Sequence, residues 1–381
     1  MKGINLVAAA FALTALSYGL ARFAYGLFLP QIREDLALSV LASGWIGGGA
    51  FAAYCLGIGF TFAASGKIAP RMIALFAGVA ATAGMAIVTI AASGWVLGIG
   101  IALAGLSSGL ASPPLASAVS RQFRESERPK ANGTINAGTA VGIVFSGIAA
   151  LMATGSWREL YTLFALIGAG VSVWLWLALP PGTYGENNRG FSFAVLKRDG
   201  VLTLCLSAFV AGVSSTAVWT FGANILRGDF GFSTTQIAWA WIVLGAVGVA
   251  GSLTGVLTHR YGTLCIHAWA LLGIGAGTLG LAATSISDAY GFAAMGLFGM
   301  AYIISTGTYL IQGIELLPDQ PDLGLGIPFL MLALGQTLGT PLFGATLEAV
   351  GTLGALCIFA MAAGCAGAIR PRQAMRDSVP H

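Results

Sequence analysis

A lone arginine, Arg22, stands inside a long apolar stretch near the start of the chain. In a helix, Tyr18 and Tyr25 would share its stripe. An Arg at the centre of a membrane helix costs about 2.5–3.5 kcal/mol, and its planar fork of donors fits a carboxylate or phosphate. We therefore predict that Arg22 grips an anionic ligand between the two tyrosines. The alternative is that Arg22 snorkels to the outer headgroups or bonds backbone carbonyls.

Other apolar runs contain hydroxyl and amide groups at helical spacing, which could complete a binding site around Arg22. Such groups also commonly form hydrogen bonds between membrane helices. For each residue, this structural role is the alternative to ligand binding. The predicted ligand contacts besides Arg22, Tyr18 and Tyr25 are Ser108, Thr216, Asn224, Tyr302 and Tyr309. Asn136 and Gln336 are weaker candidates of the same kind.

Motifs of enzymes and cofactor proteins are missing from the sequence. It has no phosphate-binding glycine loop after a strand and no Ser/His/Asp set, and its five cysteines show no CxxC pair. We therefore expect no enzymatic activity, no cofactor and no metal site.

Composition indicates which elements hold these side chains. Hydrophobic residues make up 57% of the 381 residues and charged residues 8%, against about 25% charged in a soluble domain. The mean hydropathy is +0.85, and the 55 glycines are typical of helices packed closely in lipid. The apolar runs are too long for the strands of a barrel. Twelve runs reach the length of about 20 residues that a spanning helix needs: 5–29, 40–64, 70–92, 95–119, 131–154, 159–179, 201–226, 235–257, 263–284, 289–315, 324–348 and 351–369.

The basic residues predict the orientation of these helices. With the N-terminus inside, 14 Lys and Arg residues face the cytoplasm and 3 face outward, while Arg22 lies within the membrane. We therefore expect a multi-pass membrane protein with both termini cytoplasmic. The net charge of +4 then sets topology and indicates no nucleic-acid partner.

An internal repeat divides the chain near its middle. Residues 33–39 (REDLALS) match residues 227–233 (RGDFGFS) at a shift of 194, which also pairs Arg22 with Thr216. At a slightly different shift, residues 137–142 match residues 334–339. Two related sets of six helices are typical of secondary transporters. We predict a first half at 1–180, a cytoplasmic linker at 181–200 and a second half at 201–381.

The same shift places Arg121 opposite Glu315, so that two helices would end at the cytoplasm with opposite charges. Such ends could latch the cytoplasmic face when the halves close there. The alternative is that the basic residues only enforce orientation.

Taken together, these features resemble the major facilitator superfamily. The loop GVLTHRYG at 255–262 is similar to the cytoplasmic motif G-x-L-x-D-R-x-G of that family, with His259 in place of the acid. The resemblance implies a gating role for Arg260. The first-half counterpart at 59–66 keeps only Gly59 and Gly66, which puts a similar charge latch there in doubt.

The stretch YGLARFAYGLFLPQIREDL resembles the YbfB/YjiJ-like bacterial branch of the superfamily. The resemblance implies that the protein lies in a bacterial inner membrane. Drug antiporters of the superfamily often have an acid in helix one and an Arg in helix four, and this chain has neither. We therefore expect a monomeric transporter that moves a small anionic or amphipathic organic solute by alternating access. The alternatives are efflux of hydrophobic drugs or toxic metabolites, and a sensor or scaffold without transport. A coupling proton or ion stays an open option. No carboxylate lies deep enough in the predicted membrane helices to be named as a proton carrier.

The predicted orientation can be tested by chemical labelling. A reactive cysteine placed in the 183–195 loop should be shielded from impermeant thiol reagents outside intact cells, whereas one at Ser287 should react. The reverse labelling pattern would overturn the orientation.

Overall fold

The computed structural model describes residues 2–64, 67–124, 127–152, 156–179 and 193–369, and in these ranges the chain is helical and contains no strand. The first half consists of α1 (Lys2–Thr14), η1 (Ala15–Phe23), α2 (Ala24–Leu36), α3 (Val40–Ala64), α4 (Pro70–Thr89), α5 (Gly94–Gln122), α6 (Arg128–Met152) and α7 (Trp157–Ala178). The rest consists of η2 (Phe193–Lys197), α8 (Val201–Trp219), α9 (Gly222–Gly228), α10 (Thr234–Gly248), η3 (Val249–Leu253), α11 (Thr254–Tyr261), α12 (Thr263–Gly280), η4 (Leu281–Ser285), α13 (Asp288–Leu316) and α14 (Pro321–Ala368).

The described elements join into 11 stretches that are long and apolar enough to cross a membrane. The last stretch has 46 residues, about twice the length needed at 1.5 Å per residue. Gly351 interrupts α14 with φ 73° and ψ 176°, so two helices meet there. This break yields the twelfth spanning helix and confirms the predicted twelve-helix membrane fold.

Three spans are broken within their length, although the sequence predicted continuous helices, and the ninth ends in the 3₁₀ turn η4. The first contains η1, a nine-residue π-helix that carries Arg22. The seventh is interrupted at Thr220 and Phe221, between α8 and α9. The eighth passes through the 3₁₀ turn η3 between α10 and α11. Such irregular segments are frequent at functional sites.

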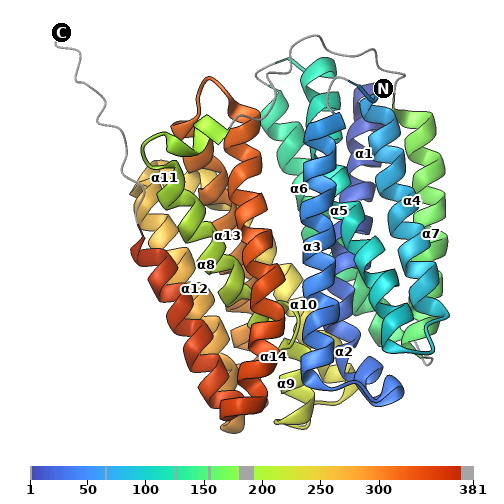
Figure 1. Cartoon of the computed structure of the whole chain (residues 1–381), viewed down its shortest axis with the longest axis vertical. Helices are drawn as coiled ribbons and strands as arrows, with labels where there is room; N and C mark the ends of the chain where they lie inside the picture. The colour runs from blue at the N-terminus through green and yellow to red at the C-terminus, as the bar shows by residue number, and fades with distance from the viewer. Residues whose placement is uncertain (1, 65–66, 125–126, 153–155, 180–192, 370–381) are drawn as a thin grey trace.

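The chain forms two helical bundles side by side, α1–α7 and α8–α14, which meet through α2, α3 and α6 on one side and α9, α10 and α14 on the other (Figure 1). We call the end at which α1 begins the predicted cytoplasmic end, and the end with the 37–39 and 229–233 turns the predicted outer end. The 181–200 linker lies outside the described residues up to 192, and η2 then packs against α8.

Helix packing repeats between the two halves at the shift found in the sequence. A Cβ on Gly105 would lie 2.3 Å from the carbonyl oxygen of Ala50, and one on Gly299 would lie 2.1 Å from that of Leu244. Residue numbers differ by 194 in both pairs. The two predicted six-helix sets therefore pack their internal helices through corresponding residues.

The seam between the halves follows the same symmetry. A Cβ on Gly44 of α3 would lie 2.9 Å from Cα of Pro341 in α14. One on Gly147 of α6 would lie 3.1 Å from the carbonyl oxygen of Ala238 in α10. A shift of 194 exchanges these two contacts. The sequence match of 137–142 with 334–339 is therefore three residues out of register, because glycine patterns tolerate an error of nearly one helical turn.

Close backbone contact at the repeated glycines predicts a specific stability effect. Gly105→Ala should lower the free energy of unfolding by about 1–3 kcal/mol, because the added methyl meets backbone that has no room to move. The matched control is Gly49→Ala, since a Cβ there meets nothing within 4 Å. Thermal unfolding of both purified variants in detergent measures the difference, and equal melting temperatures would contradict the packing argument.

Candidate functional site

Arg22 lies inside the protein, where aromatic rings surround its guanidinium. The residue is 7% exposed. Its Cζ atom is 4.4 Å from the ring centre of Tyr54 and 4.5 Å from that of Phe51. It is 5.1 Å from the Phe23 ring and 5.7 Å from the Tyr18 ring. Attraction to ring faces offsets part of the cost of burying the charge. In this structure Arg22 therefore stays in the interior and does not snorkel.

The guanidinium is held by an uncharged amide from the other half. Arg22 Nη2 donates to Gln336 Oε1 at 2.8 Å. The Gln336 amide nitrogen in turn donates to Ser215 Oγ at 3.0 Å and Tyr302 Oη at 3.2 Å. Gln336, only a weak candidate in the sequence, thus connects three helices at the seam. An amide orients the guanidinium but leaves its charge unneutralised.

In the described part of the chain, the carboxylates that form ion pairs do so with arginines other than Arg22. These ion pairs are Arg158–Asp35, Arg198–Asp319 and Arg227–Glu34. All of them are near helix ends, and Arg22 takes part in none. Arg22 Nε is also buried without a hydrogen-bond partner. A buried cation without a counter-charge is costly, so the geometry is suited to an anionic ligand.

Tyr18 connects the guanidinium to the molecular surface. Its hydroxyl lies 2.8 Å from Ser112 Oγ, and either group can donate. Ser112 is exposed and Tyr18 partly exposed. Ser112 was not among the predicted contacts. The predicted Ser108 is buried and donates to the Gly105 carbonyl of its own helix at 2.8 Å.

Tyr25 does not flank Arg22 as the sequence predicted. Its hydroxyl donates to the Ser43 carbonyl at 3.0 Å. The prediction assumed α-helical spacing, whereas η1 has more residues per turn and changes which side chains share a face. Thr216 is buried next to Ser215 in sequence, and its hydroxyl donates to the Val213 carbonyl at 2.7 Å.

The two tyrosines of α13 lie in different surroundings. Tyr302 reaches the Arg22 site through Gln336. The Tyr309 hydroxyl is 2.9 Å from Ser207 Oγ, and its ring packs edge-on against His267 at 5.0 Å. His267 is fully buried, with its Nε2 atom 3.3 Å from Ser207 Oγ and its Nδ1 atom 3.2 Å from Thr308 Oγ1. Tyr309 therefore belongs to a polar cluster within the second half.

Reciprocal polar contacts join the halves at the predicted outer end. Arg33 donates to the Asn224 amide oxygen at 2.6 Å, and Arg227 pairs with Glu34 at 2.8 Å. Arg33 and Arg227 are repeat partners at the shift of 194. Asn224, predicted as a ligand contact, thus helps to close this end.

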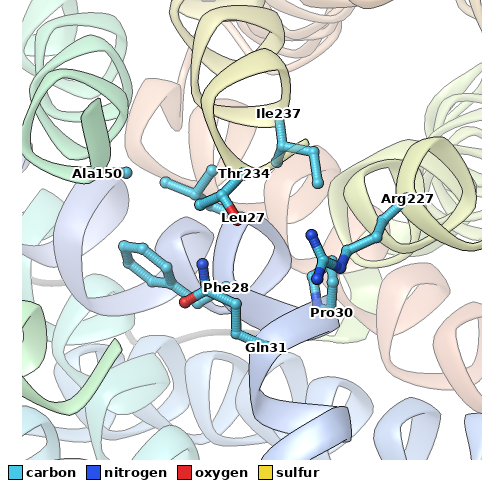
Figure 2. Close-up of a pocket in the computed structure, with 8 residues that line it drawn as sticks. All are labelled: Leu27, Phe28, Pro30, Gln31, Ala150, Arg227, Thr234 and Ile237. Carbon is cyan, nitrogen blue, oxygen red and sulfur yellow. The ribbon is translucent and has the colours of Figure 1, made fainter. Parts of the chain in front are cut away.

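A crevice also lies at the outer end, between α2, α6, α9 and α10. Figure 2 shows Arg227 pointing toward Pro30 at its edge, among Leu27, Phe28, Gln31, Ala150, Thr234 and Ile237. Its cavity volume of about 10 Å³ is room for about one water molecule. The crevice is a gap in the closed seam and is separate from the Arg22 site.

The predicted cytoplasmic gate is described only in part, and its latch stays a prediction. The Arg121 side chain lies outside the described part, and Glu315 is exposed. Arg260 is exposed, with its Cζ atom 5.2 Å from the Tyr261 ring. Asp319, from the acidic stretch after Glu315, pairs with Arg198. Hydrogen bonds from that guanidinium hold the pKa of the Asp319 carboxyl well below its usual range.

The sequence matches the model of a known protein family along most of its length. The model described as Major Facilitator Superfamily matches residues 11–340. The chain belongs to the major facilitator superfamily. Membership makes it a multi-pass membrane protein with the fold of a transporter and confirms the family that the sequence resembled. Its place in the YbfB/YjiJ-like branch stays a prediction.

Solved structures of the superfamily share the fold along almost the whole chain. The nucleoside transporter NupG is similar with a TM-score of 0.76 and 13% identity over 97% of this chain and 98% of that chain. A bacterial homologue of the human lysosomal transporter Spinster, in an inward-facing and unoccupied conformation, is similar with a TM-score of 0.69 and 18% identity over 97% and 94%.

A sequence relative carries a different kind of name. The chain is 27% identical over 294 residues to "Transcription regulatory protein OpdE" of Pseudomonas aeruginosa. The match covers 71% of this chain and 71% of that protein.

The outer contacts predict a shift in the balance between conformations. Arg227→Glu should populate structures in which the outer ends separate, because two carboxylates then face each other. Adding Glu34→Arg should restore the distribution. An exposed pair contributes about 0–1 kcal/mol, so populations should change by about fivefold or less. Distances between spin labels on α2 and α9 measure the change.

The control for this prediction is Arg158→Glu. It breaks the pair with Asp35, which lies within the first half. It should leave the distribution between the halves unchanged. Equal shifts for Arg158→Glu and Arg227→Glu would mean that the Arg227–Glu34 pair is no latch.

Proposed function

We propose that this protein is a secondary transporter of small organic monoanions. The observation that carries the proposal is the Arg22 guanidinium, 7% exposed at the seam between the halves and hydrogen-bonded to the uncharged Gln336. A buried cation without a counter-ion favours an anion that brings one negative charge. A dianion would leave the surplus charge in an apolar interior, so one cation favours a monoanion.

The rings around Arg22 favour a ligand with an apolar or aromatic body. Phe51 and Tyr54 face the guanidinium, and Tyr54 packs edge-on against Tyr18. Arg22 Nε has a free donor, the Tyr18 ring centre lies 5.7 Å from the Arg22 Cζ atom, and the Tyr18 hydroxyl in turn contacts Ser112. A carboxylate could use these donors while its aromatic or aliphatic body packs on the rings. We therefore propose an aromatic monocarboxylate as the ligand class.

The transport cycle that we propose is alternating access between the two halves, 1–180 and 201–381, across the bacterial inner membrane. Polar contacts close the predicted outer end in this structure. Ser112, where the site reaches the surface, is nearer the Gln122 end of α5 than its Gly94 end. Both features support access from the predicted cytoplasmic side in this state, with outward opening after the outer contacts separate.

A second candidate function is sensing without transport. The likeness to a protein named as a transcription regulatory protein favours it. A sensor would bind the same anion at Arg22 but would not move it. Counterflow in proteoliposomes separates the two, because exchange of labelled anion across the vesicle membrane requires transport.

Arg22 variants test the proposal directly, with benzoate as the probe and benzamide as its neutral counterpart. Benzoate should raise the melting temperature of the wild-type protein by mass action, and benzamide should not. Arg22→Lys should weaken benzoate binding by about tenfold or more, since an ammonium lacks the planar fork. Arg22→Gln should weaken it further.

Two controls define the outcomes of this experiment. Arg124→Gln removes an exposed charge just after the end of α5 and should bind benzoate as the wild type does. Expression of the Arg22 variants should stay near the wild-type level, since Lys keeps a charge of the same insertion cost and Gln relieves that cost. Equal benzoate affinity in the wild type and both Arg22 variants would refute an anion site at Arg22.

A further inference from the structure

Trp219 ends α8 and carries a buried hydrogen-bond donor without an acceptor. The residue is 2% exposed, and its Nε1–H has no partner. Buried indole N–H groups usually find an acceptor, because an unmade hydrogen bond destabilises the folded state. Such a donor is available to a ligand, provided that its place in the molecule lets a ligand reach it.

The place of Trp219 links it to Arg22 through a closed ring of contacts. Trp219 stacks on Phe23 at 4.0 Å between ring centres, and Phe23 adjoins Arg22 in the chain. On the other side, Trp219 packs edge-on against Tyr302 at 5.1 Å. Tyr302 accepts from Gln336, which accepts from Arg22. Trp219 and Arg22 thus border the same region from opposite halves.

This region is closed toward the predicted outer end. A Cβ on Gly26 of α2 would lie 2.0 Å from the Trp219 carbonyl oxygen, so backbone meets backbone beyond the indole. A ligand that enters beside Tyr18 and Ser112 would therefore reach Arg22 first and Trp219 next.

We propose that Trp219 is a ligand-binding residue whose indole N–H donates to the carboxylate of the anion held by Arg22. This inference rests on the proposed function. Arg22 Nε and Trp219 Nε1 are both donors without acceptors. A carboxylate only accepts hydrogen bonds, whereas a carboxamide also presents donors that these groups cannot satisfy. Trp219 thereby adds selectivity for the acid over its amide and provides a ligand contact from the second half.

Trp241 offers a matched control. Its indole is fully buried and its N–H also has no acceptor. It packs edge-on against Trp219 at 6.2 Å, but the ring of contacts between Arg22 and Trp219 does not pass through it.

Benzoate binding to Trp219→Phe and Trp241→Phe tests the inference. Phenylalanine keeps an aromatic ring against Phe23 but removes the indole N–H together with part of the ring system, and Trp241→Phe makes the same loss of volume. Trp219→Phe should weaken benzoate binding by about tenfold, as expected for loss of one hydrogen bond to a charged group, while Trp241→Phe should change it less than about threefold. A melting temperature near that of the wild type without benzoate shows that each variant is folded.

Indole N–H resonances of the isotope-labelled protein in nanodiscs provide a second measurement. The Trp219 signal is identified by its loss in Trp219→Phe, and benzoate should move it toward the hydrogen-bonded range. The readout itself is made on the wild-type protein, and Trp219→Tyr assigns the signal where Trp219→Phe fails to fold. Benzoate that binds through Arg22 without moving this resonance overturns the inference and leaves the proposed function intact. Absence of benzoate binding to the wild type overturns both.

Discussion

A positive charge buried at the meeting point of two helical bundles is the constraint on which the rest of this molecule depends. The Arg22 guanidinium has aromatic faces around it and one amide partner, Gln336, from the other half. Pairing with a carboxylate of the protein would stabilise this charge permanently and leave an incoming anion little to gain. An amide holds the guanidinium in place, and its weaker bond can be exchanged for a ligand.

The bond between Arg22 and Gln336 would also couple the proposed ligand binding to the relation between the halves. Gln336 contacts Ser215 and Tyr302, so its amide gathers α8, α13 and α14 at the point where η1 arrives from the first half. A ligand that takes over Arg22 would release this amide and weaken a contact across the seam. A change of contacts at one side chain can thereby bias the balance between two conformations of the whole protein.

The remainder of the seam combines contacts of two kinds. Glycines such as Gly44 and Gly147 let helix backbones approach closely along the membrane interior. At the predicted outer end, the exposed Arg227–Glu34 pair contributes only a modest free energy. Packing thus keeps the halves in register, and weak polar contacts join them at the predicted outer end in this structure. The repeat relation of 194 residues between corresponding contacts shows that both halves use the same surface for this purpose.

The sequence by itself determined the membrane fold, the helix count, the internal repeat and the unusual position of Arg22. Hydropathy, helix length and repeat spacing are properties of the chain in one dimension, and lipid enforces them strongly. Only the tertiary structure decided what surrounds Arg22. Its partner Gln336 is 314 residues away, the rings of Phe51 and Tyr54 come from α3, and the π-helical η1 turns Tyr25 toward Ser43. Helical spacing gives the stripe on which a side chain lies, but the partner depends on which helix faces meet and on local winding, and long-range packing sets both.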